Sequence, residues 1–454
     1  MKKNEIFKAE IIDTNNLGFG VCRINDKVVF VSGAVTGDIA EIKIIKTAPS
    51  YSVGIPVSFD VKSPMRCQVS CPVSSSCGGC AYSLINYTAE LESKKRAVIY
   101  AMKKAGVYVD VADVLSTGRI TGYRNKAQYP VACNANTGRI YAGFYAPKTH
   151  RVIEATRCML QPEVFSDITE FILAFLNDKK VSAYSEETGK GTVRHIYLRR
   201  AEAEKQIMVC LVVNSNTFEL AYELAEQLKF RFPEITSFML NHNTTNTNVI
   251  LGKNFTLISG KPYIEDILCG VKVRISPDGF YQVNREGAEL LYNTGIKAAS
   301  LKKGDLVLDL YCGAGMISLA ASKIVPEIKI IGVEIVESAV ENARLNARAN
   351  GVYDAEYYQG DASDLDSILA CRKEKPACVI VDPPRKGCAA STLDYIVKTG
   401  TEKILYISCD PDTLARDMAI LTGKGYAPST SVIPVDMFPR TGHVETVVLM
   451  TRNI

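Results

Sequence analysis

The chain has 454 residues, of which 47% are hydrophobic and 22% are charged. At about 100–200 residues per domain this length predicts about two to four domains, and the apolar content excludes a disordered chain. No stretch approaches the roughly 18 uncharged apolar residues of a membrane-spanning helix, and the basic start of the chain lacks a signal-peptide core. We therefore expect a cytoplasmic protein that makes no membrane contact.

The charge balance is nearly even, because lysine and arginine outnumber aspartate and glutamate by only 53 to 49. Net charge therefore does not identify a nucleic-acid-binding protein. Residues 61–126 are an exception, with ten basic and four acidic side chains. Such a stretch is typical either of a phosphate-contacting surface or of an ordinary solvated face.

The first 60 residues predict short strands, at 11–12, 27–31 and 38–44, with glycines between them. This spacing favours a small five-stranded OB-like β-barrel, a fold that commonly binds nucleic acids. A loop rich in cysteine and serine follows at 61–81, and the pattern of residues 83–105 predicts a helix.

Residues 61–275 as a whole predict a central α+β domain, in which strands alternate irregularly with helices such as 162–176 and 218–230. From 276 to 454 the alternation becomes regular, with apolar strands expected at 306–310, 328–333, 378–381, 404–407 and 444–450. Helices are expected between them, at 336–350 and 412–421 for example. This pattern predicts a mostly parallel, doubly wound α/β sheet, whose ligands bind beyond the carboxyl ends of the strands.

The first strand of this sheet ends in the sequence DLYCGAG at 309–315, whose glycines allow a tight turn and the close approach of a ligand. Glu334 ends the second strand, where it can accept hydrogen bonds from ribose hydroxyls, and Asp361 follows the third, near where an adenine would lie. Ser318 replaces the next glycine of the dinucleotide fingerprint. The set favours S-adenosylmethionine over a nicotinamide dinucleotide, although loop turns with helix-capping acids would give the same pattern.

Two further loops follow the next two strands. Asp382 begins the sequence DPPR at 382–385, in which the prolines hold the loop extended. Cys409 lies in the sequence SCDP at 408–411. Most intracellular cysteines are inert packing, but a cysteine at this edge, beside a methyl-donor pocket, is a candidate nucleophile.

Five motifs therefore occur in a fixed order: FYQVN at 280–284, DLYCGAG, DPPR, SCDP and HVE at 443–445. Together they resemble the RNA uracil-C5-methyltransferases of the RumA/TrmA type, and the resemblance spans essentially the whole chain. It implies a Rossmann-like S-adenosylmethionine-dependent methyltransferase domain at 276–454. It also implies that the barrel at 1–60 is a TRAM domain and that the central domain at 61–275 carries an iron–sulfur loop, as in the branch that acts on 23S rRNA.

The resemblance also assigns roles to individual residues. Cys409 would be the nucleophile and Glu445 the base. The S-adenosylmethionine pocket would be lined by Gln282, Tyr311, Glu334 and Asp382, with Asp361 nearby. Three positions depart from the family pattern: Met316 and Asp410 stand where an asparagine is common, and Asp361 stands where an asparagine sometimes occurs.

The chemistry explains why such residues are needed. Uracil C5 is too weak a nucleophile to attack a methyl sulfonium directly, whereas addition of a thiolate to C6 makes C5 enolate-like. A thiolate both attacks and leaves readily, and a carboxylate such as Glu445 can remove the C5 proton. The uridine must be flipped out or single-stranded, and Arg124 and Lys126 are either phosphate contacts or ordinary surface charges.

The chain has 14 cysteines, and a disulfide framework is not expected because the cytoplasm keeps thiols reduced. Thiolates select iron–sulfur clusters or zinc. The set of Cys71, Cys77, Cys80 and Cys158 resembles the family's ligands for a [4Fe-4S] cluster, while spacing alone leaves a structural zinc ion open. Cys67 is surplus to either site.

The favoured function is an RNA uracil-C5-methyltransferase that forms 5-methyluridine in 23S rRNA. A tRNA-directed relative is the first alternative, and the cysteine set and the barrel argue against it. A non-catalytic iron–sulfur RNA-binding protein is the second, and Cys409 and Glu445 argue against that. No obligate protein partner is inferred.

Overall fold

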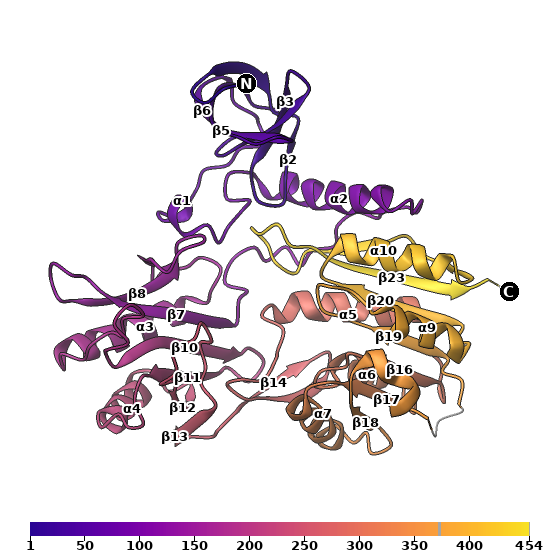
Figure 1. Cartoon of the computed structure of the whole chain (residues 1–454). Helices are drawn as coiled ribbons and strands as arrows, with labels where there is room; N and C mark the ends of the chain where they lie inside the picture. The colour runs from indigo at the N-terminus through magenta and orange to yellow at the C-terminus, as the bar shows by residue number, and fades with distance from the viewer. Residues whose placement is uncertain (371–373, 454) are drawn as a thin grey trace.

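The computed structural model describes residues 1–370 and 374–453, and it shows a small barrel above two larger sheets (Figure 1). The barrel is a six-stranded sheet in the order β1-β5-β6-β4-β3-β2. Its strands are β1 (Ile6–Glu10), β2 (Asp13–Thr14), β3 (Gly20–Ile24), β4 (Lys27–Val31), β5 (Ile39–Thr47) and β6 (Tyr51–Val61). Alternate side chains such as Val29 and Ile42 fill its core. The sequence predicted five strands and placed one at 11–12, where the structure has the turn between β1 and β2.

The cysteine segment, residues 67–85, connects the barrel to a long helix. It contains the single-turn helix α1 (Ser74–Cys77), and α2 (Tyr87–Lys104) follows it. The Asn86 side chain caps α2 by accepting a hydrogen bond from the Ala89 N–H. Figure 1 shows α2 between the barrel and the C-terminal sheet, where it packs against α10 (Pro411–Thr422).

The central domain is a seven-stranded sheet in the order β13-β12-β11-β10-β7-β8-β9, which confirms the expected α+β fold. Helices α3 and α4 pack on it through side chains such as Phe165 and Leu224. The elements are β7 (Lys126–Cys133), β8 (Ile140–Tyr145), β9 (Val152–Glu154), α3 (Glu163–Asp178), β10 (Val193–Ala201), β11 (Gln206–Val213), α4 (Ala221–Arg231), β12 (Ile235–His242) and β13 (Asn254–Gly260). A hairpin of β14 (Ile264–Leu268) and β15 (Val271–Ile275) leads to the C-terminal domain.

The C-terminal domain is an eight-stranded sheet, in which β18-β17-β16-β19-β20 are parallel and β23 is antiparallel to β20. Strands β21 and β22 pair with β23. The elements are α5 (Arg285–Ala299), β16 (Leu306–Leu310), α6 (Met316–Ile324), β17 (Lys329–Glu334), α7 (Glu337–Ala349), β18 (Glu356–Gln359), a 3-10 turn (Ala362–Asp364), α8 (Leu365–Ile368), β19 (Cys378–Val381), α9 (Ala390–Thr399), β20 (Lys403–Ser408), α10, β21 (Tyr426–Pro428), β22 (Ile433–Val435) and β23 (Glu445–Arg452). This arrangement confirms the expected α/β sheet.

Helices cover both faces of the C-terminal sheet, which explains why its strands read as unbroken apolar runs. Ile380 faces the core formed with α5, α6 and α7, whereas its neighbour Val379 faces the core formed with α9 and α10. Val98 of α2 joins the second core, so a helix from the N-terminal half completes this layer. None of the described helices is long and apolar enough to cross a lipid bilayer.

Candidate active site

The glycine turn after β16 is held in an unusual backbone conformation. Tyr311, Gly313 and Gly315 have positive φ angles of 62°, 53° and 76°. A side chain at Gly315 would come within 2.7 Å of the Tyr357 hydroxyl, whereas the space beside Gly313 is open. The turn therefore forms a cradle at the carboxyl end of the strand, and only glycine at 315 allows it to pack so closely.

One of the predicted acidic residues contacts this cradle, and another follows the neighbouring strand β18. Glu334 ends β17, and its carboxylate accepts hydrogen bonds from the Gly313 N–H at 3.1 Å and the Val336 N–H at 2.9 Å. It therefore fixes the glycine turn. Asp361 is exposed and accepts a hydrogen bond from the Ser363 N–H at 2.8 Å, which lowers the pKa of its carboxyl. Asp361 thus caps the 3-10 turn, the helix-capping role that the sequence had left open.

The predicted aromatic and amide residues lie on different sides of the strand ends. The Tyr311 and Thr392 hydroxyls are 3.3 Å apart. The Gln282 Nε2 donates to the Tyr292 hydroxyl at 3.2 Å. Burial raises the pKa of Tyr292, as do the nearby carboxylates. Tyr292 lies within α5 and belongs to no motif, so sequence analysis did not find it.

Cys409 and Glu445 come from neighbouring strands. In the antiparallel ladder of β20 and β23, Ser408 faces Thr446. Cys409 directly follows Ser408 and Glu445 directly precedes Thr446, so both residues adjoin the last pair of this ladder, and the charge of Glu445 raises the pKa of the Cys409 thiol. The nucleophile and the base predicted from the sequence are therefore neighbours.

Burial and mutual repulsion raise the pKa values of the three acidic groups. Burial raises the pKa of Glu445 to about 8, with a further contribution from Asp382, while Arg385 lowers it. Burial, Glu445 and Asp382 raise the pKa of the Cys409 thiol to about 11, and Arg385 again opposes them. Burial and then Asp309 raise the pKa of Asp382 to about 7. Several groups with strongly shifted pKa values at one edge of a sheet are typical of a catalytic site.

Arg385 is the cation of this group. Its Nη2 lies 3.2 Å from the His443 ring, and burial and then Arg385 lower the pKa of that imidazole. Arg385 was quoted within a motif but received no role in the sequence analysis. The site thus combines a thiol, a carboxyl group and a guanidinium beside an open cradle, which suits nucleophilic addition followed by proton removal.

Comparison with known proteins identifies the family. The profile of the tRNA (uracil-5-)-methyltransferase family matches residues 203–453, and the profile of the TRAM domain matches residues 2–57. The chain belongs to this methyltransferase family. An RNA methyltransferase of Clostridium tetani is 38% identical over 99% of this chain and 97% of its own, and one from Bacillus cereus is 36% identical over 100% and 98%.

A solved structure shares the whole fold. The Pyrococcus abyssi tRNA (uracil-54, C5)-methyltransferase in complex with S-adenosyl-L-homocysteine is 23% identical, with a TM-score of 0.76 over 98% of this chain and 99% of its own. The chain is therefore an S-adenosylmethionine-dependent RNA uracil-5-methyltransferase by family, and its barrel is a TRAM domain.

The residues of this methyltransferase fit the methyl donor. The open space beside Gly313 is bordered by Glu334, which can accept from ribose hydroxyls, and Asp361 lies after the next strand. Asp382 lies within electrostatic reach of Cys409, and its ionised form would stabilise a sulfonium. The glycine turn and the acidic strand ends therefore supply the chemistry that S-adenosylmethionine requires.

The cysteine segment brings four thiols within electrostatic reach of one another. Burial raises the pKa of Cys80 to about 12, and the neighbouring thiols contribute in the order Cys158, Cys77, Cys71. Cys67 stands apart, because its Sγ donates to backbone carbonyls of the segment, the closer being Ile85 at 3.1 Å. Within residues 1–370 and 374–453 no histidine, cysteine, aspartate and glutamate side chains are arranged to hold a single metal ion.

Of the two predicted phosphate contacts, Arg124 lies within electrostatic reach of both sites. Arg124 influences the ionisation of both Cys158 and His443, so it lies between the cysteine set and the methyltransferase site. Burial, Arg199 and then Arg124 lower the pKa of Lys126 to about 8. The structure thus brings basic groups together at the junction of the central and C-terminal domains.

Proposed function

We propose that this methyltransferase forms 5-methyluridine in 23S rRNA through a covalent bond between Cys409 and uracil C6. The observation that carries the proposal is that Cys409 and Glu445 each adjoin the last pair of the β20–β23 ladder, Ser408 and Thr446. One residue adds to C6 and the other removes the proton from the adjacent C5, so the two groups must lie one base width apart. Neighbouring strands provide that spacing.

In this mechanism each step uses a group of the chain. The Cys409 thiolate attacks C6, and the electron pair of the C5–C6 bond makes C5 nucleophilic. Gln282, Tyr311, Glu334 and Asp382, with Asp361, would hold S-adenosylmethionine, which supplies a methyl group on an activated sulfonium. Glu445 then takes the C5 proton, and the electron pair of that C–H bond re-forms the double bond and expels Cys409 as thiolate.

The ionisation of the site fits a cationic cofactor. With pKa values raised to about 11 and about 8, Cys409 and Glu445 both hold their protons at neutral pH in the protein alone. A positive charge placed near Asp382 favours the ionised form of each group. Binding of the cofactor would therefore activate the nucleophile and the base together, and Arg385 contributes in the same direction.

For the cysteine set we propose a [4Fe-4S] cluster held by Cys71, Cys77, Cys80 and Cys158. Cys158, Cys77 and Cys71 each influence the ionisation of Cys80, and thiolates are the ligands that iron–sulfur clusters require. Reduced thiols are also what the proposed cytoplasmic location predicts. The cluster would shape the surface that receives RNA.

Two classes of RNA are candidate substrates. The cysteine set favours 23S rRNA on the resemblance given above. A specific observation keeps tRNA as a second candidate, since the Pyrococcus abyssi enzyme that shares the fold over 98% of this chain is named for uracil 54 of tRNA. The architecture by itself is therefore compatible with either RNA.

One experiment separates these possibilities. The protein is incubated with radiolabelled methyl donor and either 23S rRNA or total tRNA, both lacking 5-methyluridine, and the modified position is mapped. Label in 23S rRNA supports the proposal, and label in tRNA alone replaces the substrate. RNA containing 5-fluorouridine should form a stable adduct. Its C5 carries fluorine in place of hydrogen, so the base has no C5 proton to remove and Cys409 is not released. Absence of any adduct would refute the covalent mechanism.

A further inference from the structure

The base loop, residues 436–444, joins β22 to β23 and ends directly before Glu445. Val435, the residue before this loop, pairs with Glu445 across the two strands. The loop therefore starts and ends beside the base, and any shift of the loop moves the Glu445 backbone. What holds the loop comes from a distant part of the chain.

Helix α2 holds the first part of the base loop through a buried cation. The Lys94 ammonium donates to Asp436 at 2.7 Å and to the Phe438 carbonyl at 3.2 Å, and its third contact is Glu90 at 2.8 Å. The side chains of all three charged residues are fully buried. The Tyr87 hydroxyl donates to the second oxygen of Asp436 at 2.7 Å.

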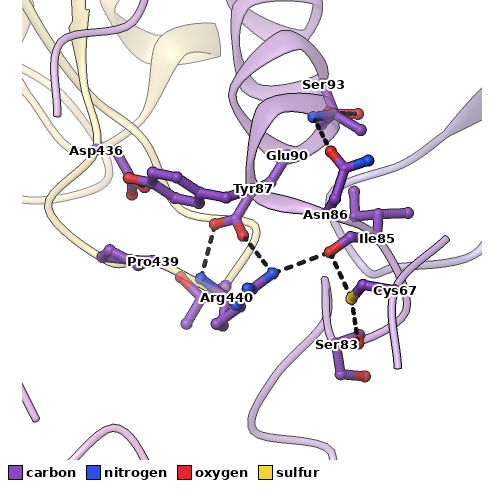
Figure 2. A network of polar contacts seen from close by, with 12 residues as sticks. Cys67, Ser83, Ile85, Asn86, Tyr87, Glu90, Ser93, Asp436, Pro439 and Arg440 are labelled. Atoms are coloured by element: carbon purple, nitrogen blue, oxygen red, sulfur yellow. Dashed lines mark hydrogen bonds and ion pairs between the residues drawn. The ribbon is translucent and has the colours of Figure 1, made fainter. Parts of the chain in front are cut away.

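Arg440 holds the second part of the loop, as Figure 2 shows. Its backbone N–H donates to Glu90 at 2.7 Å, and its guanidinium donates to the Ile85 carbonyl at 2.9 Å. The Arg440 carbonyl in turn accepts from the Tyr82 N–H at 3.1 Å. Its φ of 71° is rarely adopted by a residue other than glycine, so the surrounding contacts hold it there.

The partners of Arg440 belong to the cysteine segment. Tyr82 lies two residues after Cys80, and the Ile85 carbonyl that receives Arg440 also receives the Cys67 thiol (Figure 2). Cys67 therefore takes part in the contact between the base loop and the cysteine segment, apart from the other four cysteines. The base loop and the segment that carries Cys71, Cys77 and Cys80 share one hydrogen-bond network.

The TRAM barrel also contacts both the base loop and the cysteine segment. A side chain at Gly442 would meet the Asn16 carbonyl oxygen at 1.8 Å, and one at Gly18 would meet the Ala81 carbonyl oxygen at 2.0 Å. The turn between β2 and β3 therefore touches both the base loop and the residue after Cys80. Three segments that are distant in the sequence meet at one point.

A buried set of charges is a weak source of net stability, because desolvation offsets much of the attraction between the charges. Its geometry, however, is specific. We propose that Arg440 is a positioning residue: through the base loop it sets Glu445 against uracil C5 and makes that position depend on the packing of the cysteine segment. This inference rests on the proposed roles of Cys409 and Glu445.

The test measures removal of the C5 proton, the one step that Glu445 performs in the proposed mechanism. In the Arg440→Ala protein, addition of Cys409 and methyl transfer should proceed while proton removal slows by about 10–100-fold, the usual effect of a small misplacement. Mixing with ordinary substrate RNA should then give a burst of one S-adenosylhomocysteine per enzyme and a denaturant-resistant methylated enzyme–RNA complex. Arg440→Lys should restore part of the turnover, because its ammonium remains beside Glu90.

Arg194→Ala is the matched control. Arg194 is also a buried arginine that donates to backbone carbonyls, but these are the carbonyls of Asn243 and Thr245 in the central domain. It should accumulate no complex. A readout independent of activity is hydrogen exchange over 436–445, which should rise in Arg440→Ala and stay at the wild-type level in Arg194→Ala.

The outcomes separate the two proposals. If the wild-type protein forms no adduct with 5-fluorouridine RNA, the proposed function fails. If the wild type forms the adduct and turns over, but Arg440→Ala accumulates no complex or loses every step equally, the positioning role is wrong. Unchanged exchange over 436–445 would also overturn it.

Discussion

Lys94 and Asp436 are 342 residues apart in the sequence, and their side chains form a 2.7 Å ion pair with no exposed surface. The pair joins a helix of the N-terminal half to the loop before the base. Because removing one partner of a buried pair leaves an uncompensated charge, Lys94→Met should lower the free energy of unfolding by about 3–5 kcal/mol. Urea denaturation measures it.

The neighbouring lysine provides the control for that measurement. Lys95 pairs with Asp113, whose side chain is 95% exposed. Lys95→Met should change the free energy of unfolding by less than about 0.5 kcal/mol, as is usual at the surface. Equal decreases in the free energy of unfolding of the two variants would show that the buried pair of Lys94 and Asp436 contributes no more to stability than a surface pair.

The second prediction concerns the nucleophile. Cys409→Ala should lower methylation by at least about a thousandfold, since no other group can form the bond to C6. Binding of RNA, measured by filter retention, should change little. Cys133→Ala is the matched control, because Cys133 is an exposed thiol in the central domain. Methylation by Cys409→Ala at a rate near that of the wild type would rule out the covalent mechanism.

The third prediction concerns the base. In Glu445→Gln the amide cannot accept the C5 proton, so elimination should slow by about 10²–10⁴-fold while the earlier steps continue. A methylated covalent complex should then accumulate on ordinary RNA and be visible after electrophoresis in denaturant. The absence of this complex, with turnover retained, would show that another group removes the proton.

The fourth prediction is a pH dependence. Glu445, whose pKa is raised to about 8, and Cys409, whose pKa is raised to about 11, both act in their ionised forms, so the rate should rise with pH. Arg385 lowers both pKa values. Arg385→Gln should therefore shift the acidic limb of the pH–rate profile to higher pH.

Lys386→Gln is the control for this profile, because Lys386 lies in the same loop and contributes to neither shift. The rate at which iodoacetamide alkylates Cys409, followed by peptide mass spectrometry, measures the ionisation of this thiol directly. A charged analogue such as sinefungin should speed alkylation at pH 8 more than the neutral S-adenosylhomocysteine does. Equal rates with the two analogues would contradict electrostatic activation.

The fifth prediction concerns the cluster. Protein purified without oxygen should contain about four irons and acid-labile sulfide per chain. Cys80→Ala should lose the iron, whereas Cys67→Ala should retain it, because the Cys67 thiol donates to backbone carbonyls outside the set. Stoichiometric zinc without iron, or loss of iron in Cys67→Ala, would show that the assignment of ligands is wrong.

The sequence was most informative where local pattern decides the structure. The strands β16 and β19 match the predicted bounds, because buried parallel strands are unbroken apolar runs. That Cys409 and Glu445 adjoin the same pair of the β20–β23 ladder could be expected only from the resemblance, because neither motif indicates the order of the strands.

The buried contacts between α2 and the base loop could not be predicted from the sequence, for a physical reason. Glu90 and Lys94 are spaced as a helix surface pair, a pattern typical of a solvated face. Their burial depends on Asp436 and Arg440, which the fold supplies from more than 340 residues away. No local pattern carries that information.

The tight contact between Gly442 and Asn16 bears on redesign of the enzyme. Since a carbonyl oxygen fills the place of a side chain at 442, a foreign barrel could be grafted onto this catalytic half only if its β2–β3 turn followed the same path. Chimaeras that retarget the methyl group to another RNA would therefore have to exchange the turn and residues 436–444 together.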